Sequence, residues 1–142
     1  MGRSQETGAT VILTTINLDP FTRAYLECAL WSSNDESTPA GGDPMDSNYS
    51  IQDIAPEAVE KIKVDCAKFQ AENAADIEQG YAGPNYTVTE RAGHDFWLTR
   101  HRHGAGFWDG DWPEAVGERL TVASHKFKEA DFYIGDDGLI YC

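Results

Sequence analysis

The segment G-H-D-F-W-L-T-R-H-R-H-G-A-G-F-W-D-G-D-W, residues 93–112, decides the predicted fold class. Two short aromatic runs, Asp95–Arg100 and Ala105–Asp109, lie on either side of His101–Gly104. Short runs rich in aromatic residues and separated by a turn sequence are typical of a β-hairpin. We therefore predict a hairpin here.

Further strands are predicted on both sides of this segment. Phe132–Ile134 and Leu139–Tyr141 lie on either side of G-D-D-G, a strong turn sequence, and predict a second hairpin. Tyr86–Arg91 alternates like a strand, and the β-branched run Thr10–Ile16 predicts another.

Three helices are predicted from capping residues and apolar spacing. The first, over 20–32, begins at Asp19-Pro20 and carries an apolar row of Phe21, Ala24, Tyr25, Cys28 and Trp31. The second begins near Pro56 and ends at Gly80, with Val59, Ile62, Cys66, Phe69 and Ile77 on one face. The third opens with a predicted capping box, Asp111-x-x-Glu114, and its apolar row is Val116, Leu120, Ala123 and Phe127.

These elements predict a single α+β domain over residues 10–142, with about three helices packed on a small antiparallel sheet built from hairpins. Residues 1–9 are polar and are predicted to be a flexible N-terminus. A long acidic loop is predicted at about 33–50, where Ser, Asn, Asp, Gly and Pro accumulate.

The charge excludes two classes of function. The chain has 142 residues, a formal net charge of −13 and a pI near 4.5. A general nucleic-acid binder or a protein that docks on anionic membranes needs a basic surface, so neither is expected. No apolar run approaches the ~20 residues that span a bilayer, and no export signal is evident. A cytoplasmic location is therefore expected.

The negative charge is concentrated in the first half of the chain. Residues 24–60 contain no lysine or arginine. The acidic residues of this stretch include the candidate binding residues Asp35, Glu36, Asp43, Asp46, Asp53 and Glu57. Two interpretations stay open: charge that only keeps the protein dispersed, or a docking surface for a partner with a basic surface.

The aromatic segment suggests candidate chemistry. His101-x-His103 on an extended segment, with Asp109 or Asp111, would be the start of a metal site, but the sequence identifies no complete ligand set. Alternate strand residues point to opposite faces, so His94 and Asp95 are not expected to pair as a catalytic dyad.

Three further side chains of this segment are candidates for partner recognition: Trp97, Arg100 and Trp108. The alternative is a tryptophan-rich hairpin that only packs against helices. Cys28, Cys66 and Cys142 form an odd, dispersed set, which predicts neither a disulfide scaffold nor a zinc site, and we expect Cys28 and Cys66 in the core. No nucleotide-binding motif occurs, and no cofactor is expected.

Two long motifs carry a resemblance. F-T-R-A-Y-L-E-C-A-L-W-S-S-N-D-E at 21–36 and G-H-D-F-W-L-T-R-x-x-H-G-A-G-F-W-D at 93–109 resemble a family of small acidic proteins encoded by tailed phages, prophages and other mobile elements. The resemblance covers roughly Phe21 to Tyr141 and implies a phage-encoded protein, in the host cytoplasm, without implying an activity.

Together these observations favour a non-enzymatic accessory protein that binds a host or phage nucleic-acid-handling protein through its acidic surface, as a DNA mimic or anti-defence inhibitor. The alternatives are a small metal-dependent or His/Asp-based enzyme centred on residues 94–111, and a virion structural protein.

Overall fold

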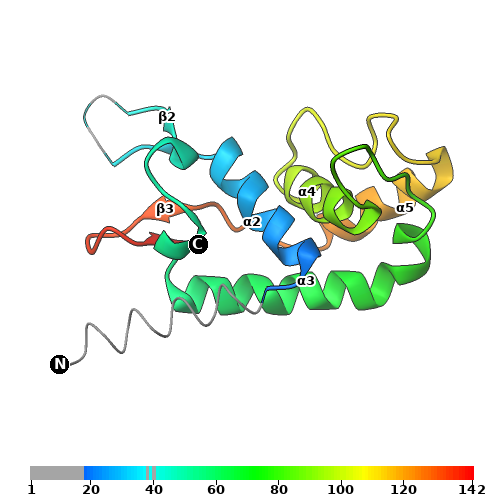
Figure 1. Ribbon diagram of the computed structural model, residues 1–142, viewed down its shortest axis with the longest axis horizontal. Coiled ribbons are helices and arrows are strands. Elements are labelled where there is room, and N and C mark those ends of the chain that lie inside the picture. Colours follow the sequence, from blue (N-terminus) through cyan, green and yellow to red (C-terminus); the bar gives the residue numbers. More distant parts are fainter. Residues whose placement is uncertain (1–17, 38, 40) are drawn as a thin grey trace.

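The computed structural model describes residues 18–37, 39 and 41–142 (Figure 1). The predicted flexible terminus at 1–9 and the predicted strand at 10–16 lie outside the described residues. The described chain forms a single α+β domain. Its helices are α2 (Pro20–Ser32), α3 (Pro56–Ile77), α4 (Val88–Arg100) and α5 (Glu114–His125), with short 3-10 helices η1 (Met45–Ser47) and η2 (Ile51–Asp53). Its strands are β1 (Asn34–Asp35), β2 (Asp43–Pro44), β3 (Tyr133–Ile134) and β4 (Ile140–Tyr141).

The predicted start and end of α2 are confirmed. The Asp19 side chain accepts a hydrogen bond from the Thr22 amide at 3.0 Å, and Pro20 is the first helical residue. An N-cap carboxylate followed by proline satisfies free backbone donors and fixes the first φ angle, so the helix begins here. Tyr25 and Cys28 are buried as predicted, but Trp31 is 61% exposed.

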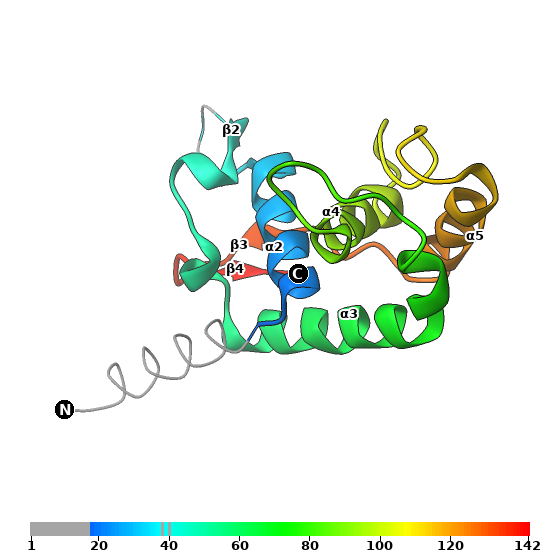
Figure 2. The same cartoon turned by 45° about the vertical axis from the view of Figure 1, so that its right-hand side comes forward.

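The second predicted helix is also confirmed as α3. All five predicted face residues are buried, from Val59 to Ile77. The helix bends at Asn73, whose backbone is not helical and whose side-chain amide donates to the Phe69 carbonyl at 2.9 Å. α3 runs along one side of the molecule and passes beneath α2 and α4 in both ribbon views (Figures 1 and 2).

The predicted strand at 86–91 and the predicted hairpin at 95–109 are wrong, because Val88–Arg100 is a helix. A capping box starts it: the Thr87 hydroxyl accepts from the Glu90 amide at 3.1 Å, and Glu90 Oε1 accepts from the Thr87 amide at 2.7 Å. From Ala92 to Arg100 every residue except His94 is buried. A helix buried on nearly all sides loses the polar face that reveals a period of 3.6, so its sequence looks like a strand.

The helices pack on one another, and the predicted sheet beneath them is absent from the described residues. β1 pairs only with β2, and β3 only with β4, each pair antiparallel. The second of these is the predicted C-terminal hairpin, which is confirmed, with Gly138 at φ +81° in its turn. α5 is confirmed as a helix, but the Asp111–Glu114 capping box is not formed, since Pro113 occupies the N-cap.

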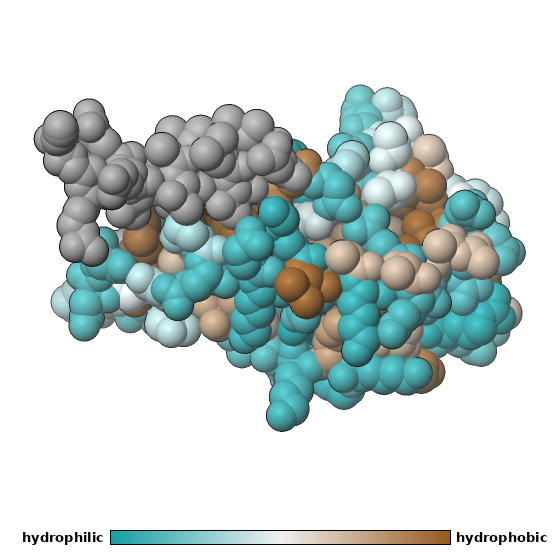
Figure 3. Space-filling model, turned by 90° about the horizontal axis from the view of Figure 1, so that it is seen from below, coloured by the Kyte–Doolittle hydropathy of each residue, from teal (hydrophilic) through white to brown (hydrophobic). Residues whose placement is uncertain are grey.

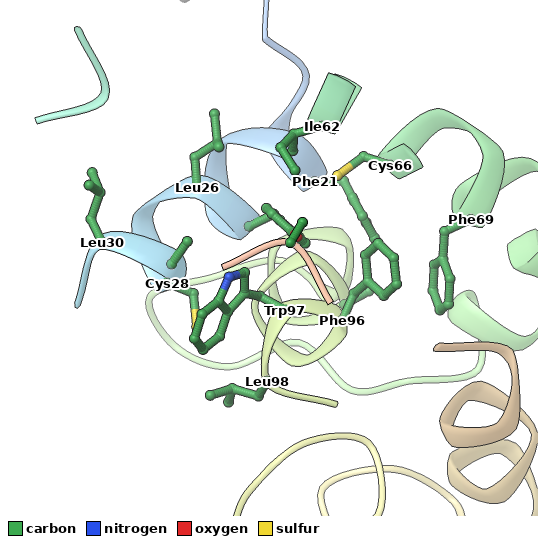
Figure 4. Packing of buried hydrophobic residues seen from close by; sticks show 14 of the residues in the cluster. Phe21, Leu26, Cys28, Leu30, Ile62, Cys66, Phe69, Phe96, Trp97 and Leu98 are labelled. Carbon is green, nitrogen blue, oxygen red and sulfur yellow. The ribbon is translucent and has the colours of Figure 1, made fainter. Parts of the chain in front are cut away.

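The core is formed by aromatic side chains from α2, α3 and α4 (Figure 4). Phe69 and Phe96 stack with ring centroids 4.1 Å apart, and Phe96 also contacts Phe21 and Tyr25 at 6.0 and 5.5 Å. Gly93 lets α4 approach α2 closely, because a Cβ atom there would lie 2.1 Å from the Phe21 carbonyl oxygen. α4 is therefore the central element of the packing.

Candidate functional site

A cavity of about 530 Å³ opens between α2 and α4, and we name it the α2–α4 cavity. It is lined by Ala24, Glu27, Cys28 and Trp31 of α2, by Asn85, Tyr86, Glu90, Arg91, His94, Asp95 and Leu98 in and before α4, and by Ala105, Asp109 and Asp111 of the following loop. Concave sites that combine aromatic walls with a few polar groups are where small ligands and side chains bind.

His94 and Asp95 form a hydrogen-bonded pair in this cavity. His94 Nδ1 lies 3.1 Å from Asp95 Oδ1, and the other carboxylate oxygen accepts from Trp112 Nε1 at 2.7 Å. The Asp95 side chain is buried, whereas that of His94 is 46% exposed. The prediction that these neighbours cannot pair was wrong because it assumed a strand; on a helix successive side chains diverge by only about 100°.

The pairing changes the protonation of His94. The hydrogen bond to Asp95, followed by hydrogen bonding to the Cys28 thiol, raises the pKa of His94 well above its ordinary value of 6.5, against the opposing effect of burial. His94 therefore carries a positive charge at neutral pH and donates its Nδ1–H to Asp95.

We expect the Cε1–H chemical shift of His94, followed by NMR, to stay at its protonated value through pH 7.5. A raised folded-state pKa means that the stability contributed by this group is fully present below pH 6.5 and is lost as the pH rises toward the folded-state pKa. In Asp95→Asn the carboxylate is gone, so the titration should move back toward 6.5. A wild-type midpoint near 6.5 would contradict the assignment.

Trp31 and Arg91 complete the cavity walls. The exposed Trp31 ring lies 6.5 Å from the His94 ring. The Arg91 guanidinium lies over the Tyr86 ring at 4.5 Å, and its Nη1 pairs with Asp111 at 3.0 Å. Arg91 Nε is buried and has no acceptor among the described residues. A buried donor without an acceptor is uncommon, and a bound water or a ligand atom can supply the missing partner.

The predicted metal-binding residues do not converge. His101 is buried: its Nδ1 lies 2.9 Å from the Trp97 carbonyl and its Nε2 accepts from the Ala130 amide at 3.0 Å, so both nitrogens are occupied. Burial and the neighbouring Arg100 charge lower the pKa of His101, which keeps it neutral. The His103 ring packs at a tilt against Trp97, with ring centroids 4.8 Å apart, and Asp109 accepts from the Gly106 amide at 3.2 Å.

Asp111 is held by its ion pair with Arg91. Within the described part of the chain, no group of three or more His, Cys, Asp and Glu side chains is arranged to hold a metal ion.

Of the three residues of this segment predicted for partner recognition, only Trp108 is exposed, at 55%. Trp97 is buried and stacks on His101 at 4.4 Å. Arg100 is buried and donates to the Lys128 carbonyl, the Tyr25 hydroxyl and Asp65 at 2.7, 3.1 and 2.8 Å. The burial of Trp97 and Arg100 follows from the helix that replaced the predicted hairpin, and it gives both residues a structural role.

The carboxylates of residues 24–60 divide into two groups. Asp35 is buried and accepts from the Ser37 amide at 2.8 Å, and Asp53 accepts from the Ser50 amide at 2.8 Å, so both serve the local backbone. The other four predicted binding residues are exposed: Glu36, Asp43, Asp46 and Glu57. β2, η1, η2 and the start of α3 lie at the same end of the molecule in both ribbon views (Figures 1 and 2).

A second hollow, of about 630 Å³, lies at this end of the molecule. It lies between α2 and residues 46–52, and Glu27 lines both hollows. Elsewhere, on the face shown in Figure 3, hydrophilic side chains predominate and hydrophobic ones are scattered among them. Binding features of the described residues therefore include exposed carboxylates, these two hollows and the exposed Trp31 and Trp108.

Comparison with protein-family models, with curated proteins and with solved structures finds no match for this chain. No helix in the described part of the chain is long and apolar enough to cross a bilayer.

Proposed function

We propose that this protein is a binding protein that docks on a partner with a basic surface. The observation that carries the proposal is the exposure of Glu36, Asp43, Asp46 and Glu57 at one end of the molecule, and we call these four residues the acidic surface. Carboxylates grouped in this way attract a positively charged partner and speed its association.

Within the described residues, no ion pair neutralises the acidic surface. None of its four carboxylates forms an ion pair with another described residue. The nearest lysine or arginine along the chain from this stretch is Arg23 on one side and Lys61 on the other. The attraction between exposed charges falls off over roughly 8 Å at physiological salt, so the acidic surface acts on a partner that approaches closely.

The partner class that fits best is a protein whose own groove handles nucleic acid. Such grooves are basic because they bind phosphates, and carboxylates on a rigid scaffold present the same sign of charge. The resemblance to small phage-encoded acidic proteins supports an accessory role of this kind, in the host cytoplasm, as a DNA mimic or anti-defence inhibitor.

The test compares two variants with the same net charge. The first neutralises the acidic surface with Glu36→Gln, Asp43→Asn, Asp46→Asn and Glu57→Gln. The matched control neutralises four exposed carboxylates elsewhere, with Glu72→Gln, Glu78→Gln, Glu118→Gln and Glu129→Gln. Each protein is immobilised and used to capture proteins from host lysate at moderate salt.

We expect the wild type and the control to retain the same basic protein, and the acidic-surface variant to lose it. Retention should also fall as salt is raised, because the attraction between exposed charges is screened. Equal loss in both variants would mean that net charge alone is responsible, and retention that is insensitive to salt would contradict an electrostatic surface.

A further inference from the structure

The α2–α4 cavity contains a group that docking on the acidic surface does not use. Cys28 lies on α2, one helical turn before Trp31, and lines the cavity together with His94. It is the only cysteine among the lining residues. Cys66 is fully buried in the core and Cys142 lies outside the cavity.

Cys28 borders the cavity beside His94, although it is only 3% exposed and its sulfur lies 3.9 Å from the Ser32 hydroxyl. His94 is a partly exposed imidazole on the facing helix, and it is oriented by its 3.1 Å hydrogen bond to Asp95. Asp95 is in turn held by Trp112 at 2.7 Å. A nucleophile, a base and a third group that orients the base are the components of thiol-dependent acyl transfer.

We propose that Cys28 is a nucleophilic thiol and His94 its proton-transfer partner, with Asp95 as a positioning residue, and that the cavity takes a small acyl compound with a carbonyl carbon open to attack. This activity goes beyond partner binding and does not depend on the acidic surface. A cation beside a cysteine favours the thiolate, which is the reactive form.

The proposed reaction needs only Cys28, His94, the acyl compound and water. The thiolate sulfur bonds to the acyl carbon, the carbonyl electron pair moves to oxygen, and the leaving group departs with the proton of the His94 imidazolium. Neutral His94 then takes a proton from water as the hydroxide attacks the thioester. The carboxylic acid leaves, and the thiolate and imidazolium are restored.

Acyl transfer also needs a group that stabilises the negative charge developing on the carbonyl oxygen, and we propose Arg91 for this role. A developing oxyanion needs a fixed donor, and removing one donor from such a site costs roughly 10²–10³ in rate. Arg91 lies one turn before His94 on α4, lines the cavity and has a buried Nε–H without an acceptor among the described residues. We assign the Arg91 guanidinium as the positive group that stabilises the charge developing on the carbonyl oxygen.

The first experiment measures the alkylation rate of each cysteine by iodoacetamide in the native full-length protein, with peptide mass spectrometry. The three cysteines serve as internal controls for one another. We expect Cys28 to react at least about ten-fold faster than Cys66, because Cys28 borders the cavity beside His94 whereas Cys66 is enclosed in the core, where burial raises the pKa of its thiol. Equal rates at Cys28 and Cys66 would overturn the proposal.

The His94→Gln variant then tests whether His94 activates the Cys28 thiol or only supports the fold. His125→Gln, on the exposed face of α5, is the matched control. We expect His94→Gln to slow Cys28 about ten-fold while Cys66 is unchanged, and His125→Gln to alter neither. If His94 were only structural, its replacement would loosen the fold and both buried cysteines would react faster. An unchanged Cys28 rate would also overturn the proposal.

The second experiment tests acyl transfer with 4-nitrophenyl acetate as the probe. We expect release of nitrophenol, an acetyl group on the peptide that contains Cys28, and loss of both in Cys28→Ser. The acidic-surface variant should keep this activity, so failure here and failure of partner capture are distinguishable. Rapid alkylation without acetyl transfer would overturn the acyl-transfer step.

Discussion

Replacing Arg100 with alanine is expected to lower the free energy of unfolding by about 3–5 kcal/mol, because it removes one partner of a buried ion pair. Arg100 joins three segments: its guanidinium donates to Tyr25 of α2, to Asp65 of α3 and to the Lys128 carbonyl. The substitution leaves the buried Tyr25 hydroxyl and the Lys128 carbonyl without this donor. Urea unfolding followed by circular dichroism measures the loss.

Arg119→Ala is the matched control, since Arg119 also pairs with an aspartate, Asp76, at 2.8 Å. The Arg119 side chain is exposed, and exposed ion pairs contribute only about 0–1 kcal/mol. Arg100→Met adds a second comparison, because it keeps most of the packing volume and removes the donors. Similar losses for Arg100→Ala and Arg119→Ala would show that Arg100 does not join the helices as described.

Gly93→Ala is expected to destabilise the protein by about 3 kcal/mol, although alanine normally favours a helix interior over glycine by about 1 kcal/mol. The new Cβ would lie 2.1 Å from the Phe21 carbonyl oxygen, and the contact is with backbone that no rotamer change can move. α4 would have to move away from α2, which would loosen the contacts of Phe96 with Phe21 and Tyr25. Chemical denaturation again gives the magnitude.

Gly104→Ala provides the control for this substitution. A Cβ atom at Gly104 meets nothing within 4 Å, and its φ is not in the left-handed region. We therefore expect a change of no more than about 0.5 kcal/mol, as for other surface substitutions without a specific mechanism. A Gly93→Ala protein as stable as wild type would show that the two helices can separate at little cost.

The parts of the fold that were predicted correctly have strong local signals. α2 begins with Asp19 and Pro20, α3 shows five apolar residues on one face, and the last hairpin contains a turn with two glycines. Each of these signals acts over a few residues, so tertiary contacts do not override it.

The central helix, α4, was not predicted because its mixture of aromatic and polar residues reflects the surroundings of each side chain in the folded protein and not a local helical pattern. α4 packs against α2, α3 and α5, and its buried positions carry the polar residues Asp95, Thr99 and Arg100 as well as aromatic ones, so no apolar row with the helical period is visible. Only Thr87-x-x-Glu90, a capping box in the sequence, signals its start. The pairing of His94 with Asp95 was missed for the same reason, since it depends on the helical angle between neighbours.

The remaining site residues could not be recognised from periodicity. Trp31 belongs to the apolar row of α2, yet it is exposed beside His94 because the row extends past the edge of the core. Arg100, predicted for partner recognition, is buried because Asp65 and Tyr25, distant in sequence, provide its partners. Contacts of this kind become visible only when the chain is folded.

A backbone hydrogen bond joins the short β4 strand to the residue before α3. The Ala55 amide, immediately before α3, donates to the Ile140 carbonyl at 2.8 Å, and both residues are almost fully buried. This hydrogen bond joins segments from distant parts of the chain, and it breaks when the β3–β4 hairpin separates from the start of α3. Exchange of the Ala55 amide with solvent deuterium therefore reports that separation, while the Gly138 amide, bonded within its own turn, reports opening of the turn itself.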